Sequence, residues 1–203
     1  MKNHRGPAGW RRVPGRPIFP AMNAPPMVCI VGKKKSGKTT TVLKLVAELR
    51  QRGHRVMTIK HGHHFDLDRQ GTDSFRHRVD GGAERVVLAG PGQFAVLGTW
   101  PRGEEESPAE LAARYLADAD IVVVEGFKGE RLPKIEIFRR AAHDAPVWDP
   151  DDPTADDYIA GISDDPGYAR RTPFTTLDAD DPGLAATLAD LVETRVMGRV
   201  EAP

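Results

Sequence analysis

The sequence contains one cysteine, no long apolar run and no excess of charge of either sign. Cys29 alone cannot form an internal disulfide or a cysteine-based zinc site, and a lone thiol suits a reducing, cytoplasmic compartment. No stretch approaches the roughly 18 consecutive apolar residues of a membrane span. The chain carries 29 Lys+Arg and 29 Asp+Glu, which argues against a protein that binds nucleic acid through charge alone.

The length of 203 residues fits one domain with a full hydrophobic core. Residues 1–26 hold six prolines and five Lys or Arg side chains but no acid, so we expect a disordered basic tail there. Met22 and Met27 leave open whether translation begins before or after this tail. The predicted folded domain spans residues 27–203.

An α/β pattern follows the tail. Residues 27–32 are an apolar run that predicts a buried strand, and apolar residues at helical spacing predict a helix that begins at Lys38. A second strand is expected over residues 55–61, and a strand–helix–strand connection implies parallel strands. Further along the chain we expect a hairpin around the turn GPGQ, a helix from Ser107 to about Asp118, a buried strand at 120–126, a more exposed alternating strand at 134–138, short strands at YIAGIS and FTTL, and a last helix from Asp181–Pro182 that buries Leu184, Leu188, Leu191 and Val192.

The segment GKKKSGKT, residues 32–39, has the spacing G-x-x-x-x-G-K-[ST] between the first strand and the first helix. Its glycines let backbone N–H groups turn inward to phosphate oxygens, and the helix N-terminus adds partial positive charge. Lys38 can reach the β- and γ-phosphates, and the Thr39 hydroxyl can coordinate Mg²⁺. The predicted nucleotide-binding residues of this P-loop are Gly32, Lys35, Ser36, Gly37, Lys38, Thr39 and Thr40.

The segment DIVVVEG places Glu125 at the carboxyl end of a buried strand, where parallel sheets bind ligands. A carboxylate at this position can hold a Mg²⁺ ion or its water, or orient an attacking water. Glu125 is therefore a candidate for both metal binding and catalysis. The alternative is a strand-end acid without a chemical role.

Four segments, GKKKSGKTT, KHGHHFDLDRQGTDSFRHR, DIVVVEGFK and PKIEIFR, occur in an order that resembles the MobB family. The resemblance extends from about Met27 to Arg139, with ISDD at 162–165 as a weaker extension. It implies a P-loop NTPase fold with a largely parallel sheet, GTP with Mg²⁺ as cofactors, weak intrinsic hydrolysis and a homodimer. It also implies a GTP-binding adapter that works with a separate guanylyltransferase in the guanylylation of molybdopterin.

The base-recognition residue is not given by a standard motif. An N-K-x-D guanine pocket is excluded because the two asparagines, Asn3 and Asn23, both lie in the tail. If guanine is recognised, another acid must accept its N1–H and N2–H₂ groups. Asp164, directly after YIAGIS, is our candidate, and Asp165 is the neighbouring alternative.

The segment from residue 60 to 78 packs four histidines, three aspartates and four Lys or Arg side chains into nineteen positions. It follows the strand after the P-loop helix, so we expect it at the phosphate edge of the sheet, as a switch-like loop. Its acids would approach Mg²⁺, and its cations and imidazoles would approach phosphates or the anionic molybdopterin. Thr72 departs from the resemblance because a lysine is common there. Asp66 and Asp68 are predicted Mg²⁺ ligands together with Thr39 and Glu125, and Asp73 is a predicted catalytic residue. The predicted phosphate, pterin or switch contacts are Lys60, His61, His64, Arg76, His77 and Lys128. We expect Lys134 to lie near Lys128.

Three alternatives remain open from the residues. His61, His63 and His64 with Asp66 could bind a transition metal, as in a metallochaperone GTPase. The loop could be a solvated polar surface. A small-molecule kinase would need an arginine-rich lid, for which Arg102 or the pair Arg139–Arg140 would serve.

Overall fold

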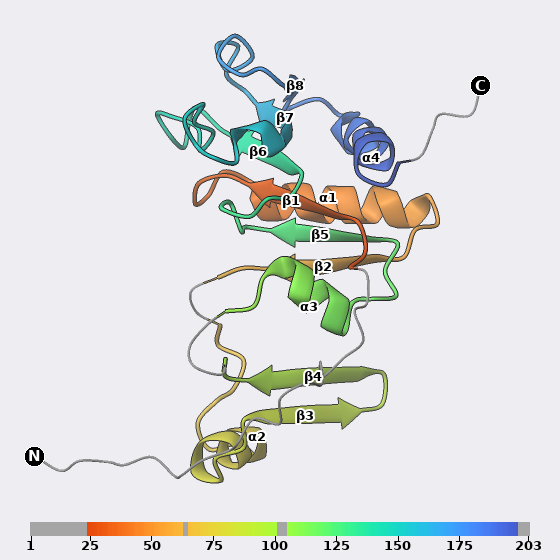
Figure 1. Cartoon of the computed structure of the whole chain (residues 1–203), viewed down its shortest axis with the longest axis vertical. Helices are drawn as coiled ribbons and strands as arrows, with labels where there is room; N and C mark the ends of the chain where they lie inside the picture. The colour runs from red at the N-terminus through yellow and green to blue at the C-terminus, as the bar shows by residue number, and fades with distance from the viewer. Residues whose placement is uncertain (1–23, 63–64, 101–104, 199–203) are drawn as a thin grey trace, which may run out of the picture.

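The computed structural model describes residues 24–62, 65–100 and 105–198. A six-stranded sheet in which neighbouring strands pair in parallel forms its centre (Figure 1). This confirms the predicted α/β class with a largely parallel sheet. The strand order is β2-β5-β1-β6-β7-β8, with bounds β1 Met27–Val31, β2 Val56–Lys60, β5 Ile121–Glu125, β6 Lys134–Phe138, β7 Tyr158–Ser163 and β8 Thr175–Asp178.

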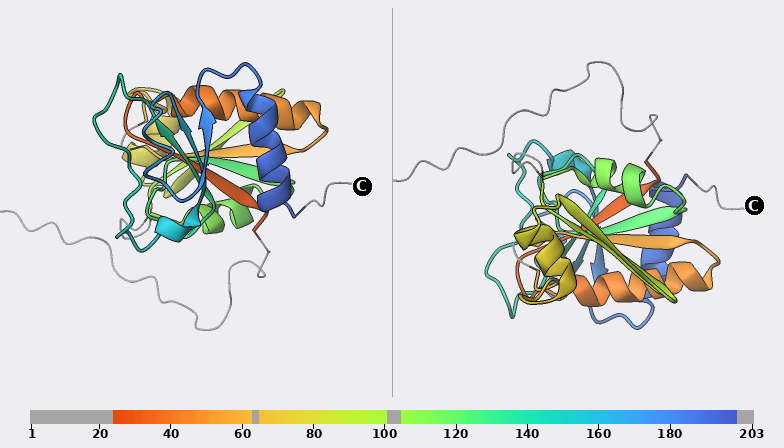
Figure 2. Two further views of the ribbon diagram at one scale, coloured as in Figure 1. Left: turned by 90° about the horizontal axis from the view of Figure 1, so that it is seen from above. Right: turned by 90° about the horizontal axis from the view of Figure 1, so that it is seen from below.

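Helices cover both faces of this sheet (Figure 2). The helices α1 (Lys38–Gln51) and α4 (Leu184–Arg195) pack on one face through leucines and valines at helical spacing. The helix α3 (Pro108–Tyr115) lies on the other face, where Ala112 joins a second apolar cluster. Burial on both faces explains why β1 and β5 are continuous apolar runs.

A separate two-stranded antiparallel sheet is formed by β3 (Arg85–Gly90) and β4 (Gln93–Gly98), as the turn GPGQ predicts. The short helix α2 (Asp73–Phe75) continues into a π-helical turn, Arg76–Asp80. Figure 1 shows the hairpin and α2 together at the end of the molecule beyond β2. A 3-10 turn, Ala155–Asp157, precedes β7.

Three details differ from the sequence prediction. The strand β6 is fully buried rather than exposed, because it lies between β1 and β7 in the sheet. The helix α3 ends at Tyr115 rather than near Asp118, because the chain must turn into β5. Asp120 fixes that turn, since its carboxylate accepts from the Arg55 N–H at 2.7 Å. Leu191 of α4 is only partly buried.

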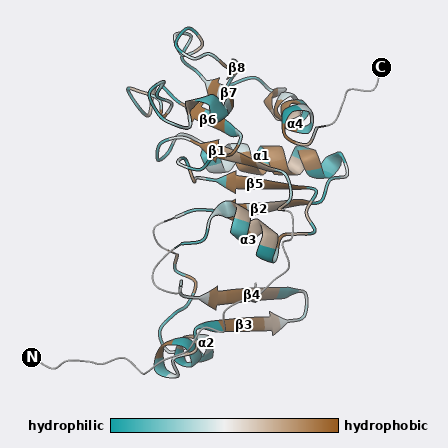
Figure 3. Cartoon of the chain, in the orientation of Figure 1, coloured by the Kyte–Doolittle hydropathy of each residue, from teal (hydrophilic) through white to brown (hydrophobic). Residues whose placement is uncertain are grey.

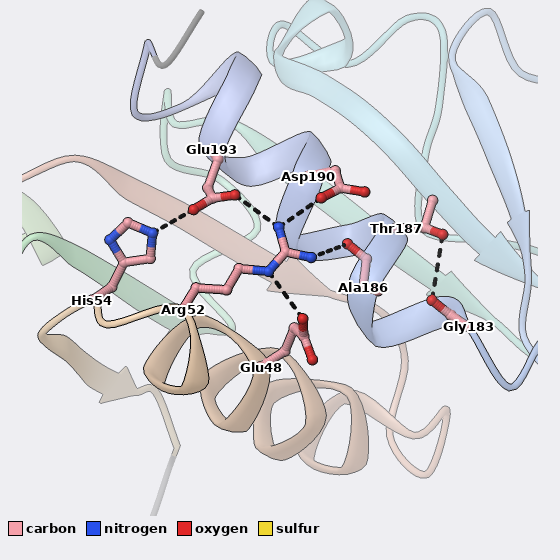
Figure 4. Close-up of polar contacts among 8 residues, drawn as sticks. All are labelled: Glu48, Arg52, His54, Gly183, Ala186, Thr187, Asp190 and Glu193. Atoms are coloured by element: carbon pink, nitrogen blue, oxygen red, sulfur yellow. Dashed lines mark hydrogen bonds and ion pairs between the residues drawn. The ribbon is translucent and has the colours of Figure 1, made fainter. Parts of the chain in front are cut away.

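A charged network joins α1 to α4 (Figure 4). The Arg52 guanidinium contacts Glu48 at 2.9 Å, Asp190 at 2.6 Å and Glu193 at 2.8 Å. The side chain of His54, which is 3% exposed, contacts the other Glu193 oxygen at 2.5 Å. The network ties the C-terminal helix to the helix that begins at the P-loop.

Replacement Glu193→Gln is expected to lower the free energy of unfolding by about 1–2 kcal/mol at neutral pH. The hydrogen bond from His54 lowers the pKa of Glu193, and Arg52 adds to this against the effect of burial. Because the pKa is lower in the folded state, the stabilisation is present above the unfolded-state pKa and is lost as the pH falls through the folded-state pKa. Urea denaturation of wild type and variant at several pH values between neutral and acid checks this.

The matched control is Asp190→Asn, because Asp190 contacts the same arginine but its side chain is 66% exposed. That variant should change the free energy of unfolding by less than about 0.5 kcal/mol. A cost of Glu193→Gln that stays constant into acid would contradict the assignment.

Candidate functional site

The P-loop leaves β1 through a glycine that no other residue can replace without movement. Gly32 has φ 148°, and an added Cβ would lie 2.6 Å from the Ile137 carbonyl oxygen and 2.7 Å from the Ser36 hydroxyl. Gly37 has φ 98° and directly precedes α1. The loop thus takes the strand-to-helix form that the motif predicts.

Two polar groups of the loop are arranged for a ligand. The Lys38 ammonium donates to the Lys33 carbonyl at 2.7 Å, so it lies folded over the loop. Burial lowers the pKa of Lys38, while Glu125 acts in the opposite direction. The residue Ser36 is 1% exposed, and its hydroxyl has no hydrogen-bond partner among the described residues. A buried hydroxyl without a partner, at the start of a helix, fits a phosphate oxygen as its acceptor.

Glu125 lies where the sequence predicts it, at the end of β5 beside the P-loop helix. Its residue is 8% exposed. The Thr39 hydroxyl donates to its two carboxylate oxygens at 3.0 and 3.1 Å, and the Lys60 ammonium contacts one of them at 2.6 Å. The adjacent oxygens of Thr39 and Glu125 are the hard ligands that Mg²⁺ prefers, so these two residues fit that ion.

A cavity of about 710 Å³ adjoins the P-loop on the face covered by α3. His61 lines it, and its ring stacks on Phe127 with centroids 4.5 Å apart. Gly126 permits this approach, because an added Cβ would lie 2.9 Å from the His61 Cβ. Lys38 and Lys128 line the same cavity, so the structure brings His61 and Lys128 together with the P-loop.

Asp66 and Asp68 line a second cavity, of about 1020 Å³, which shares His61 and Phe127 with the first. Asp68 is engaged locally, since Arg78 contacts its carboxylate at 2.9 Å and the Ser74 hydroxyl donates to it at 3.0 Å. Burial raises the pKa of Asp68, but these hydrogen bonds outweigh it and the net pKa lies below the usual value. Asp68 therefore organises its own loop in this structure.

Three predicted residues lie apart from the P-loop cavity. Asp73, Arg76 and His77 line a small cavity beside α2, with Asp80 and Gly81. Their predicted catalytic and phosphate-contact roles stay predictions. His63, His64, Arg102 and residues 1–23, on which other predictions rest, lie outside the described residues.

Asp164 follows β7, as expected, at the same edge of the sheet as the P-loop. Its carboxylate accepts from the Arg140 N–H at 2.8 Å and lies 3.5 Å from the Arg139 guanidinium. His143 connects this region to the P-loop through a 2.6 Å contact with the Lys34 carbonyl oxygen. The role of Asp164 in base recognition stays a prediction.

Lys134, expected near Lys128 at the ligand edge, is instead fully buried. Its ammonium donates to the Glu130 carbonyl at 2.5 Å and lies 3.5 Å from Asp157. The sequence prediction also missed the contact of His143 with the P-loop. No motif marks it, because the contact joins segments that are 109 residues apart.

Within the part of the chain that the structure describes, no helix is long and apolar enough to cross a membrane. The same residues contain no group of three or more His, Cys, Asp or Glu side chains arranged to hold a metal ion.

Comparisons with known proteins agree on one family. The model of the family "Molybdopterin guanine dinucleotide synthesis protein B" matches residues 27–164. The chain is 33% identical over 178 residues to a molybdopterin-guanine dinucleotide biosynthesis adapter protein of Haemophilus influenzae, covering 84% of this chain and 89% of that protein. A protein of the same name from Escherichia coli is 37% identical over 123 residues, covering 60% of this chain and 70% of the relative.

Solved structures show the same fold. A MobB homologue from Bacillus stearothermophilus has a TM-score of 0.58 and 26% identity, covering 83% of this chain and 99% of that one. MobB from Bacillus subtilis has a TM-score of 0.62 and 22% identity, covering 86% and 99%. The central sheet and P-loop described above are therefore those of a P-loop NTPase fold.

Proposed function

The chain belongs to the MobB family, the adapter proteins of molybdopterin-guanine dinucleotide biosynthesis, and from this premise we propose that it binds GTP with Mg²⁺ and assists a guanylyltransferase in the guanylylation of molybdopterin. The observation that carries the proposal is the contact of the Thr39 hydroxyl with Glu125 at the P-loop. This contact joins the two halves of a nucleotide site across 86 residues of sequence.

In the proposed site, the Lys38 ammonium leaves the Lys33 carbonyl and binds the β- and γ-phosphate oxygens. Backbone N–H groups of the loop and the start of α1 hold the phosphates. Thr39 and Glu125 would hold Mg²⁺, and the ion would neutralise part of the negative charge of the phosphates. Asp66 is the next candidate for a contact through water.

Weak hydrolysis follows from the surroundings of Glu125. As a ligand of Mg²⁺, its carboxylate would be committed to the ion, so it would be poorly placed to act also as a base for water. A nucleotide that is bound but slowly hydrolysed suits an adapter, whose effect depends on the bound state. The cavity lined by His61 and Lys128 is the proposed place for the anionic pterin.

The hairpin supports the proposed homodimer. Its strands are largely apolar (Figure 3), yet Val87 is 66% exposed and Phe94 is 79% exposed. Apolar side chains on an exposed two-stranded sheet favour burial against another chain, and we propose a second copy as that chain.

The proposal extends to domain organisation and location. Residues 27–203 would form a single domain after the basic tail at 1–26, since α4 packs on α1 within one apolar cluster. A cytoplasmic location accords with the unpaired Cys29, whose thiol has a pKa raised by burial to about 12.

A reconstituted assay tests the proposed function. Guanylylation of molybdopterin by the purified guanylyltransferase should rise several-fold when this chain is added with GTP and Mg²⁺. Light scattering of this chain alone should give a dimer mass. The Lys38→Ala variant should give little of that gain. The variant Lys44→Ala, which replaces an exposed lysine about 1.7 turns further along α1, should give all of it. An equal effect of both variants would contradict a role for the nucleotide.

A further inference from the structure

The Lys60 ammonium forms an ion pair with the Glu125 carboxylate, which the proposed metal site requires as a ligand. It contacts Glu125 Oε1 at 2.6 Å, the shortest of the contacts to that carboxylate. The pairing register of β2 with β5 places Lys60 directly beside Glu125. The sheet itself therefore places the two residues side by side, whatever the conformation of the neighbouring loops.

Burial explains why Glu125 needs a cation in the absence of a ligand. Its side chain is 11% exposed, and a carboxylate that has lost most of its water is costly unless it is paired. Thr39 supplies a hydrogen bond but no charge. The nearby Lys38 ammonium donates instead to the Lys33 carbonyl, so among the residues that the structure describes Lys60 is the cation in contact with Glu125.

The Lys60 side chain can leave this position. Its side chain is 54% exposed, because β2 is an edge strand whose described strand neighbour is β5. A long flexible stem with an exposed path lets the ammonium move to another anion at small cost. Triphosphate oxygens bound at the P-loop would be that anion.

We propose that Lys60 is an internal competitor for the divalent cation, which holds Glu125 in the nucleotide-free protein and releases it when a triphosphate binds. The inference rests on the proposed Mg²⁺–nucleotide site and adds a positioning residue that controls the order of loading. Metal ion and ammonium cannot share one carboxylate oxygen without strong repulsion. The triphosphate removes the conflict because it offers Lys60 a new partner.

Coupling between the two ligands is the measurable consequence. Metal alone should bind weakly to wild type, whereas nucleotide should strengthen metal binding, and metal should strengthen nucleotide binding by the same factor. In a variant with an uncharged residue in place of Lys60, the metal ion has no competitor for the Glu125 carboxylate. Metal alone should then bind more tightly, and the coupling factor should fall.

The experiment titrates Mn²⁺, a paramagnetic substitute for Mg²⁺, into nucleotide-free protein and measures free Mn²⁺ by electron paramagnetic resonance. Lys60→Met should bind Mn²⁺ about tenfold or more tightly than wild type, because an ion pair to a nearly buried carboxylate no longer has to be broken. Lys60→Gln keeps a hydrogen-bond donor without the charge and should behave in the same way, which preserves the test if the methionine variant does not fold. Lys60→Arg keeps the positive charge and should therefore bind Mn²⁺ as weakly as wild type does.

Lys44→Met is the matched control, since it removes one positive charge from an exposed site on α1. It should leave Mn²⁺ affinity within about twofold of wild type, because exposed charges are screened. Unchanged or weaker Mn²⁺ binding by both neutral Lys60 variants would overturn the proposal. An increase in Lys44→Met as large as in Lys60→Met would also overturn it, because a general charge effect would then suffice.

A second measurement separates this inference from the proposed function. Binding of a fluorescent GTP analogue with and without Mg²⁺ gives the coupling factor for each protein. A wild type that binds the analogue, with the same coupling factor in Lys60→Met, contradicts only the role of Lys60. A wild type that does not bind it contradicts the proposed function itself.

Discussion

Replacement Glu136→Ala is expected to lower the free energy of unfolding by about 3–5 kcal/mol. Glu136 lies in the middle of β6 and is fully buried. Its carboxylate accepts from the Val147 and Trp148 N–H groups and from the Tyr168 hydroxyl at 2.8 Å. Alanine would leave three donors, of which the Tyr168 hydroxyl is buried, without their acceptor and a cavity beside them.

Glu136→Ala should also alter the P-loop cavity, because Val147, whose N–H group donates to Glu136, lines that cavity. Urea denaturation followed by circular dichroism measures the stability. Tyr168→Phe, which removes one of the three donors, should cost only about 1 kcal/mol. Glu84→Ala, at an exposed position, should cost less than about 0.5 kcal/mol. A cost of Glu136→Ala below about 1 kcal/mol would contradict the structural role of this carboxylate.

Glu136 also shows why part of the fold was hidden in the sequence. The alternation of Lys134, Glu136 and apolar residues is the pattern of a strand with one wet face. In the structure both polar side chains are buried, since Lys134 finds a backbone carbonyl and Glu136 finds backbone N–H groups. Those partners come from loops on either side in the sequence, and no local pattern predicts their positions.

Elements set by local physics were predicted well. The apolar run of β1, the helical spacing of α1 and the Ser107–Glu110 capping box of α3 each depend on residues close in sequence. Strand order depends on tertiary packing. The sequence therefore did not reveal that β2 pairs with β5, although this pairing brings Lys60 to Glu125.

The candidate site likewise contains some residues that local sequence patterns predict and others that they do not. The P-loop and Glu125 could be predicted because their spacing and strand context are themselves the chemistry of phosphate binding. The segment at 60–78 was predicted as one loop at the phosphate edge, but it divides. His61 lines the P-loop cavity, whereas Asp73 begins α2 and lines the separate cavity there. A run of polar side chains does not indicate where the chain turns away.

Replacement Lys38→Ala is expected to weaken GTP binding by about 30-fold to 1,000-fold in the presence of Mg²⁺. The Lys38 ammonium lies folded over the P-loop, where it contacts the Lys33 carbonyl at 2.7 Å, and it is the cation that we propose to bind the phosphates. Its loss removes a charge-assisted hydrogen bond to the phosphates and leaves Glu125 less compensated. Lys44→Ala, on the exposed side of the same helix, should retain wild-type affinity within about twofold.

The preference for GTP over ATP requires a residue that recognises the guanine base. Asp164 follows β7 and is held by Arg139 and the Arg140 N–H. If its carboxylate accepts from guanine, Asp164→Ala should bring the affinities for GTP and ATP close together while the phosphate contacts remain. An unchanged GTP preference in this variant would assign the base contact to another residue.

Calorimetric titration of GTP and ATP with Mg²⁺ into wild type and Lys38→Ala tests the central claim most directly. The claim is that the edge formed by the P-loop, Thr39 and Glu125 is a Mg²⁺–GTP site. We predict that wild type binds GTP at least about tenfold more tightly than ATP, and that Lys38→Ala loses this binding. A clear preference for ATP, or equal GTP binding by the variant, would contradict it.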